Sequence, residues 1–129
     1  MNIKGLFING KPVIKQRTYD LRSPYHGGTI ATISMADQED VNRAIDGAQA
    51  AFEVMKEMHA YQRSEILLRV VRIFEERKEE LARVLVQEAG KPIRTARGEI
   101  DRTIATYQLA AEEAKRIYGE TIPMDAAPG

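Results

Sequence analysis

Cysteine is absent from the 129-residue sequence. Its absence excludes disulfides, cysteine-based metal sites and a thiol nucleophile within these residues. The chain also lacks an excess of either charge, because 19 basic residues balance 19 acidic ones. There is therefore no electrostatic basis for binding nucleic acid or an anionic membrane. No apolar run is long enough for a signal peptide core or a membrane span, so the sequence predicts a cytoplasmic protein.

The overall composition, 43% apolar and 29% charged, is typical of a soluble globular domain or part of one.

Two pairs of strands are expected near the N-terminus. Asn9-Gly10 lies between two apolar runs, which is a strong hairpin signal because both residues tolerate a positive φ. Pro12 cannot donate to a ladder, so its strand is expected at a sheet edge. A second strand pair is predicted over 18–21 and 29–33, with a turn rich in Pro and Gly between them.

Helical spacing dominates the middle of the chain. Asp37 is predicted to cap an amphipathic surface helix with a single apolar face. The next helix, over about 60–76, is apolar around most of its circumference. A helix of this kind needs cover on several sides, and the other predicted elements cannot supply all of it. We therefore expect something outside this chain to pack there. In the preceding helix, the one that Asp37 is predicted to cap, the single apolar face comprises Val41, Ile45, Ala48, Phe52 and Met55.

A helix break is predicted at Gly90, which accepts the left-handed conformation where a helix ends, and Pro92 can begin the next helix. That next helix is predicted to close on Gly119, with Pro123 preventing its continuation. The segment 120–129 is expected to be extended. Before the break the inward residues are expected to be Leu81, Val84 and Leu85; after it they are Ile93, Ile100, Ile104, Tyr107 and Ala111.

No catalytic constellation emerges from spacing alone. Gly90-Lys91 is not a phosphate loop, because the preceding glycines are missing and Pro92 stands where Ser or Thr would hold magnesium. His26 and His59 are isolated, without ligand spacing to another His, Asp or Glu, and are expected to be surface histidines. The sequence also contains no G-x-G-x-x-G fingerprint.

Two charged residues require an explanation. Glu88 lies in the last turn of its helix, where a negative charge opposes the helix dipole. Either a cation or a donor compensates it, or it is exposed and tolerated at small cost. Arg102 lies off the apolar face of its helix, beside Gly98 and Ala105. These small neighbours leave room for a ligand or another backbone; the alternative is an exposed Arg that pairs with Glu99 or with nothing.

Six short motifs follow one another along the chain. They are Leu6-Phe7-Ile8-Asn9-Gly10, Ser23-Pro24-Tyr25-His26-Gly27-Gly28-Thr29-Ile30-Ala31, Asp40-Val41 with Arg43-Ala44 and Ala48 to Phe52, Arg63-Ser64-Glu65-Ile66-Leu67, Glu88-Ala89-Gly90-Lys91-Pro92 and Gly119-Glu120-Thr121-Ile122-Pro123. Each motif alone is weak. In this order and at this spacing, the whole chain resembles the N-terminal segment of the NAD(P)-dependent aldehyde dehydrogenase family. It departs from the family pattern at Ser23, usually Asn, and at Ala89, usually Thr.

The resemblance implies an α/β fold with a Rossmann-type cofactor domain, a catalytic domain and an oligomerisation arm. Residues 1–129 would be the N-terminal part of the cofactor-binding domain, a mostly helical segment with two β-hairpins. Family members oxidise aldehydes to acids through a thiohemiacetal on a Cys, pass hydride to NAD or NADP, and use a Glu to activate the deacylating water. These groups lie downstream in the family. The chain is therefore expected to be a fragment, inert alone, with no catalytic or cofactor-binding residue of its own; the full-length enzyme is expected to be a homo-oligomer.

The resemblance also assigns two sites. Glu88 matches an acidic position that binds a monovalent cation in several members, together with main-chain carbonyls at the positions of Leu21 and Arg22 and a downstream residue; a hard cation takes such oxygen ligands. Arg102 matches a position lining the substrate tunnel. The branch of non-phosphorylating glyceraldehyde-3-phosphate dehydrogenases and lactaldehyde dehydrogenases has Arg there, and it binds the substrate's phosphate. The expected substrate is a phosphorylated or otherwise anionic aldehyde, such as glyceraldehyde 3-phosphate, or lactaldehyde.

A competing interpretation is a non-catalytic helical interaction module derived from the same fold. Such a module has to be stable alone, so it predicts a compact core without exposed apolar faces. An enzyme segment predicts the opposite, an apolar face that is bare in the isolated chain.

Overall fold

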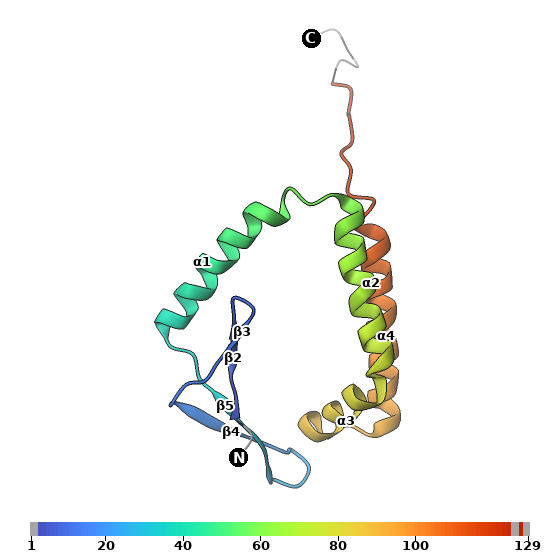
Figure 1. The fold of residues 1–129 in the computed structure, drawn as a ribbon. Coiled ribbons are helices and arrows are strands. Elements are labelled where there is room, and N and C mark those ends of the chain that lie inside the picture. Colours follow the sequence, from blue (N-terminus) through green and yellow to red (C-terminus); the bar gives the residue numbers. More distant parts are fainter. Residues whose placement is uncertain (1–2, 125–126, 128–129) are drawn as a thin grey trace.

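The computed structural model describes residues 3–124 and 127. Within that range, short strands come first and four helices follow. Figure 1 shows α1 (Gln38–Met55) on one side of the molecule and α2 (Ala60–Glu76) with α4 (Ile93–Glu113) on the other. The strands over 18–22 and 29–34 and α3 (Lys78–Ala89) lie near the opposite end from the α1–α2 connection, whereas the hairpin over 6–13 reaches toward the middle of the molecule.

Both predicted strand pairs are confirmed. Strands β2 (Leu6–Ile8) and β3 (Lys11–Val13) form an antiparallel hairpin, with positive φ at Asn9 and Gly10. Strands β4 (Thr18–Arg22) and β5 (Thr29–Ser34) also pair antiparallel.

A further short strand, β1 (Ile3–Lys4), adds to β5 in parallel and gives the sheet order β1-β5-β4. The sequence did not indicate this strand, because two residues show no period.

Helix α1 begins as predicted, with Asp37 as its cap. Gly47 lies under the tip of the β2–β3 hairpin, and a Cβ at this position would collide with the Asn9 side chain. The apolar face of α1 exists but lies open: Ile45 is 58% exposed and Phe52 is 61% exposed. This differs from the prediction of an ordinary surface helix, whose apolar face would be buried.

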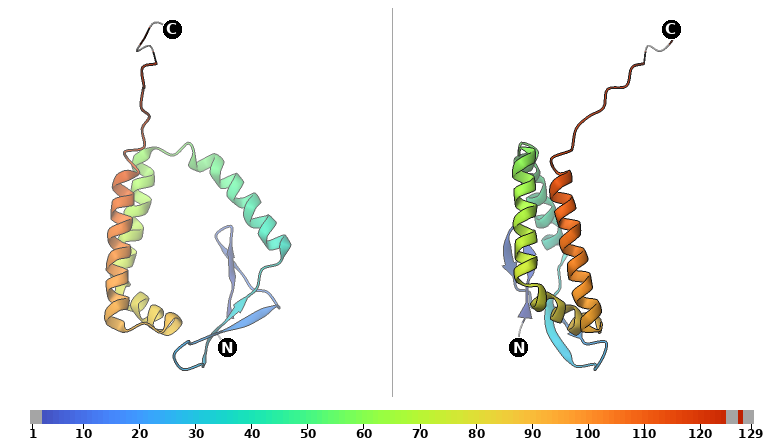
Figure 2. Two further views of the ribbon diagram at one scale, coloured as in Figure 1. Left: turned by 180° about the vertical axis from the view of Figure 1, so that it is seen from behind. Right: turned by 90° about the vertical axis from the view of Figure 1, so that its right-hand side faces the viewer.

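The core of the chain lies among the other three helices. Figure 2 shows α2 and α4 side by side, and the tilted rings of Phe74 and Tyr107 lie 5.3 Å apart between them. Helix α2 spans the predicted range. Its cover is incomplete, as expected, because Leu68 and Ile73 remain 41% and 49% exposed. At the α3–α4 corner the buried residues are Ala82, Ala96 and Ile100, with Leu81, Leu85, Val86 and Ile104 packed against them.

Three details of the helix prediction are wrong. Ile93, expected inward, is 37% exposed at the start of α4. Val84, expected inward, is exposed, and Ala82 and Val86 contribute to the core of α3 in its place. Helix α4 ends at Glu113 and not at Gly119. The Ala114 amide still donates four residues back, but the amides of Lys115 and Arg116 donate to carbonyls only three residues back, so the helix tightens and stops.

The described residues beyond that turn, 117–124, are all exposed. Ile117 and Tyr118 are 76% and 84% exposed, and a further helical turn without tertiary contacts is not stable. The chain from there to Met124 is without helix or strand, as predicted for 120–124. Positions 125, 126, 128 and 129 of the predicted extended segment lie outside the described residues. In the described part of the chain, no helix combines the length and the apolar character needed to cross a membrane.

An ionic cluster fixes the start of α1 to the loop between β3 and β4. The carboxylate of Asp40 is 1% exposed and accepts from Lys15 Nζ at 2.8 Å, Arg43 Nη2 at 2.5 Å and the Asp37 N–H at 3.1 Å. These donors, Lys15 first, hold the pKa of Asp40 well below its usual value, and they outweigh the opposing effect of burial. The cluster therefore requires an ionised Asp40.

This cluster makes the stability of the chain depend on pH. Because the pKa of Asp40 is lower in the folded than in the unfolded chain, its contribution is complete above the unfolded value of about 4 and is lost as pH falls below it. Urea unfolding midpoints are measured between pH 7 and pH 3. In the wild type, the urea concentration at the midpoint should decrease once the pH is lowered below about 4. Asp40→Asn should be less stable at pH 7 and lose less on acidification, whereas Asp46→Asn, at an exposed position of the same helix, should follow the wild type. An Asp40→Asn curve parallel to the wild type would contradict this assignment.

Candidate functional site

The β4–β5 turn docks on the corner between α3 and α4. Gly90 takes the left-handed conformation (φ 65°) that the sequence predicts, and a Cβ there would lie 3.3 Å from Pro24 Cγ. The buried Ser23 stabilises the turn, because its Oγ accepts from the amides of Tyr25 and His26. The Ser23 N–H donates to the Gly28 carbonyl, and the Ser23 carbonyl accepts from the Gly27 N–H. The position of the turn on the helices therefore depends on a glycine and a buried hydroxyl.

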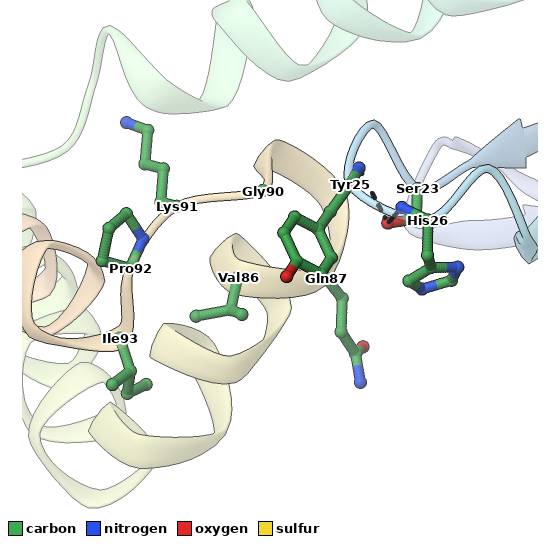
Figure 3. A pocket seen from close by; sticks show the side chains of 9 residues that line it. All are labelled: Ser23, Tyr25, His26, Val86, Gln87, Gly90, Lys91, Pro92 and Ile93. Carbon is green, nitrogen blue, oxygen red and sulfur yellow. Dashed lines mark hydrogen bonds between the residues drawn. The ribbon is translucent and has the colours of Figure 1, made fainter.

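A groove of about 440 Å³ lies between this turn and the helix corner (Figure 3). The turn groove, as we call it, is lined by Ser23, Tyr25, His26, Val86, Gln87, Gly90, Lys91, Pro92 and Ile93. Figure 3 shows the Lys91 side chain directed away from Tyr25, and its Nζ pairs with Glu99 of α4. The turn groove is mostly apolar and open.

The three residues assigned to a cation lie on neighbouring elements. Leu21 and Arg22 end β4 immediately before the turn, and the pairing of β4 with β5 is irregular between them. Glu88 is exposed in the last turn of α3, two residues before the Gly90 against which the turn packs. The donor set, one carboxylate and carbonyls beside an irregular strand end, is of the kind a hard cation takes. Within residues 3–124 and 127, no group of three His, Cys, Asp or Glu side chains could hold a metal ion.

Arg102 is exposed on the outward face of α4, opposite the buried Ala96 and Ile100. Its neighbours one turn away are Gly98 and Ala105, and a Cβ at Gly98 would meet no other atom within 4 Å. The guanidinium thus has open space beside it. In the described part of the chain, Arg102 forms no ion pair: Glu99 pairs with Lys91, and the observed state is the exposed, unpaired Arg that the alternative also allowed.

The acidic neighbours of Arg102 are engaged elsewhere. Lys91 Nζ lies 2.5 Å from Glu99 Oε1, and Lys78 Nζ lies 2.5 Å from Asp101 Oδ1. The hydrogen bond from Lys91 lowers the pKa of Glu99; burial opposes this, and the charge of Arg102 adds a smaller lowering effect. Glu99 therefore lies between two cations and makes contact with only one of them.

Both histidines are exposed, as predicted. His26 Nδ1 accepts from the Gly28 amide within the turn, and the ring of His59 stacks on Tyr61 at the start of α2. These contacts give each histidine a local structural role.

Comparison with known proteins decides the family. The profile of the Aldehyde dehydrogenase family matches residues 13–129. The chain belongs to this family. The N-terminal segment resemblance and the α/β aldehyde dehydrogenase fold are thereby confirmed.

Individual relatives agree with the family match. The chain is 40% identical over 120 residues to the lactaldehyde dehydrogenase of Methanocaldococcus jannaschii, covering 93% of this chain and 26% of the relative. It is 38% identical over 125 residues to the 3-sulfolactaldehyde dehydrogenase of Priestia aryabhattai, covering 97% and 26%. It is 34% identical over 119 residues to the D-glyceraldehyde dehydrogenase (NADP(+)) of Thermoplasma acidophilum, covering 91% and 24%. The chain thus spans about a quarter of the length of the curated relatives it matches.

Solved structures give the same result. Aldehyde dehydrogenase 21 of Physcomitrella patens, in complex with the reaction product succinate, superposes with a TM-score of 0.91 at 42% identity, covering 98% of this chain and 26% of that one. PnpE in complex with nicotinamide adenine dinucleotide superposes with a TM-score of 0.89 at 35% identity, covering 95% and 26%. Among these relatives, one structure holds NAD and one enzyme is named for NADP.

Two features of the aldehyde dehydrogenase segment were missed by the sequence analysis. The ion pair of Lys91 with Glu99 joins residues eight positions apart across a helix break. The pair of Lys15 with Asp40 joins a loop to a helix. Neither spacing is a helical one, so no periodicity indicated them.

Proposed function

We propose that this chain is the N-terminal part of the cofactor-binding domain of an aldehyde dehydrogenase. In the full-length polypeptide that carries it, an aldehyde is oxidised to its acid with NAD or NADP as hydride acceptor. The observation that supports this most strongly is the superposition of 98% of the chain on a quarter of a known aldehyde dehydrogenase. The bare apolar faces of α1 and α2 agree with it, since a standalone interaction module would need to cover them.

We infer an anionic substrate from Arg102. An Arg without an ion pair, beside open space, is suited to binding an oxyanion through two parallel hydrogen bonds. Relatives are named for 3-sulfolactaldehyde and lactaldehyde, which differ by one sulfonate group, and another was solved with succinate. A short aldehyde with a sulfonate, carboxylate or phosphate at the far end fits this requirement. In this role Arg102 orients the substrate and takes no part in bond making.

The residues that would bind the dinucleotide and carry out the chemistry belong to the part of the family fold that follows this segment. The bound NAD or NADP would supply the hydride acceptor. The segment itself contributes packing surface and the proposed anion contact. A cytoplasmic location and assembly into a homo-oligomer remain predictions from the sequence analysis.

The test is oxidation by the full-length polypeptide. NADH or NADPH formation is followed with 3-sulfolactaldehyde and lactaldehyde, and the 129-residue chain serves as the inactive control. The proposal expects turnover by the full-length polypeptide, a higher kcat/KM for the sulfonated aldehyde, and none by the short chain. Absence of turnover with either aldehyde, under conditions where the protein is folded, would contradict the proposed function.

A monovalent cation is proposed at Glu88 with the main-chain carbonyls of Leu21 and Arg22. A ligand that binds only the folded state raises stability by mass action. Replacing Na⁺ and K⁺ by choline should therefore lower the Tm of the full-length polypeptide and leave that of Glu88→Gln unchanged. An equal shift in both proteins would count against a cation at this position.

A further inference from the structure

Arg102 is available for an anion only if its acidic neighbours leave it free. Glu99 precedes it by three positions, and side chains at this spacing are neighbours on a helix surface. A Glu and an Arg so placed commonly pair. In this chain they do not, because Glu99 turns to Lys91.

Lys91 is placed for this by the helix break. It follows Gly90, where α3 ends, and precedes Pro92, the residue that caps α4. From there it reaches Glu99 across the first two turns of α4, with its Nζ 2.5 Å from Oε1. Both side chains are partly shielded, at 39% and 26% exposure.

We propose that Lys91 is a positioning residue that withholds Glu99 from Arg102 and so keeps the guanidinium free for the substrate's anionic group. The proposal rests on the proposed function, because it takes Arg102 as the anion contact. When Lys91 is removed, Glu99 loses its contact and, three positions before Arg102 on the helix surface, is free to pair with it. The substrate's anion then competes with an internal one.

The competition is testable by kinetics on the full-length polypeptide. In Lys91→Met, the substrate's anion would have to displace Glu99 from Arg102. An exposed ion pair such as Glu99 with Arg102 contributes up to about 1 kcal/mol, so the KM for 3-sulfolactaldehyde should rise about two- to fivefold. The kcat and the KM for lactaldehyde should change little. Lys91→Arg can still pair with Glu99 and should retain the wild-type KM, which separates the loss of the pair from a failure to fold. Lys78→Met is a matched control, because it releases Asp101, which is adjacent to Arg102 in sequence and does not face it.

Combining this change with Glu99→Gln distinguishes competition from a general effect of charge. If Glu99 competes for Arg102, Glu99→Gln should alter the KM little in the wild type but restore it in Lys91→Met. If the charges of Lys91 and Glu99 act on the substrate only through long-range electrostatics, Glu99→Gln should lower the KM by the same factor in the wild type and in Lys91→Met. That result would overturn the proposal. It is also overturned if Lys91→Met raises the KM of both aldehydes equally.

The variant Arg102→Met separates this inference from the proposed function. If Arg102→Met raises the KM for the sulfonated aldehyde and Lys91→Met does not, Arg102 binds the anion and only the role of Lys91 is wrong. If Arg102→Met has no effect, the substrate assignment fails and the role of Lys91 fails with it. A polypeptide that oxidises neither aldehyde would remove the proposed function and this inference together.

Discussion

Replacing Arg102 by leucine in the full-length polypeptide is expected to raise the KM for 3-sulfolactaldehyde by about 10- to 100-fold, the range given by loss of a charge-assisted hydrogen bond. The KM for lactaldehyde should stay within about twofold, because a neutral methyl end makes no such bond. The difference between the two substrates isolates the anion contact, since they share the reacting aldehyde. The measurement is a pair of steady-state titrations with each protein.

Arg97→Leu is the matched control for that experiment. It removes the same charge from the same helix, but Arg97 is already held by both carboxylate oxygens of Glu79, at 2.6 and 2.9 Å. It should therefore change neither KM by more than about twofold, as is usual for an exposed pair. If Arg102→Leu raised both values of KM equally, or if Arg97→Leu reproduced its effect, Arg102 would not be an anion contact.

Replacing Gly90 by valine is expected to lower the free energy of unfolding of the chain by about 2 kcal/mol, the cost of a left-handed backbone for a residue with a Cβ. Gly90 has φ 65°, and its new side chain would also press on Pro24 in the docked turn. Both effects act at the corner that holds the turn groove together. Guanidinium unfolding followed by circular dichroism measures the loss.

Gly90→Asn separates the two causes of that loss. Asn tolerates the left-handed conformation but still carries a Cβ close to Pro24. If backbone strain dominates, Gly90→Asn should lose clearly less stability than Gly90→Val. Equal losses would show that the contact with the turn dominates, and no loss in either variant would contradict the account of this corner.

The sequence was informative where a local rule controls the structure. The turn at Asn9-Gly10, the cap at Asp37 and the break at Gly90 each follow from the conformations that those residues allow, and all three are confirmed. The range of α2 was also predictable, because a dense apolar pattern continues through it. These features need no knowledge of the rest of the fold.

Features set by distant contacts were not predictable in the same way. The end of α4 was placed too late because Gly119 looked like a stop signal. The helix in fact ends at Glu113; Ala114 is the last described residue that is buried, and residues 115–124 are all exposed. Asp40 lies in the first turn of α1, where an acid is favourable by local rules alone, but its burial depends on Lys15 from a separate loop. For the candidate site, the room beside Arg102 followed from Gly98 and Ala105, whereas the engagement of Glu99 by Lys91 required coordinates.

The uncovered apolar faces connect the fold to the proposed function. The exposed side chains of α1 and α2 include Ile45, Phe52, Leu68 and Ile73. In aldehyde dehydrogenases of about four times this length, the same segment is one part of a larger fold. We propose that these faces pack against that larger fold, which would also enclose the space beside Arg102.

A structure of the full-length polypeptide with a bound anionic product would show directly whether Arg102 binds the anionic end of the substrate. Crystals would be grown with succinate or 3-sulfolactate and with NAD or NADP. We expect the guanidinium of Arg102 within hydrogen-bonding distance of the carboxylate or sulfonate, with Glu99 still paired to Lys91. A product bound elsewhere, or an Arg102 that pairs with a protein carboxylate beside the product, would contradict it.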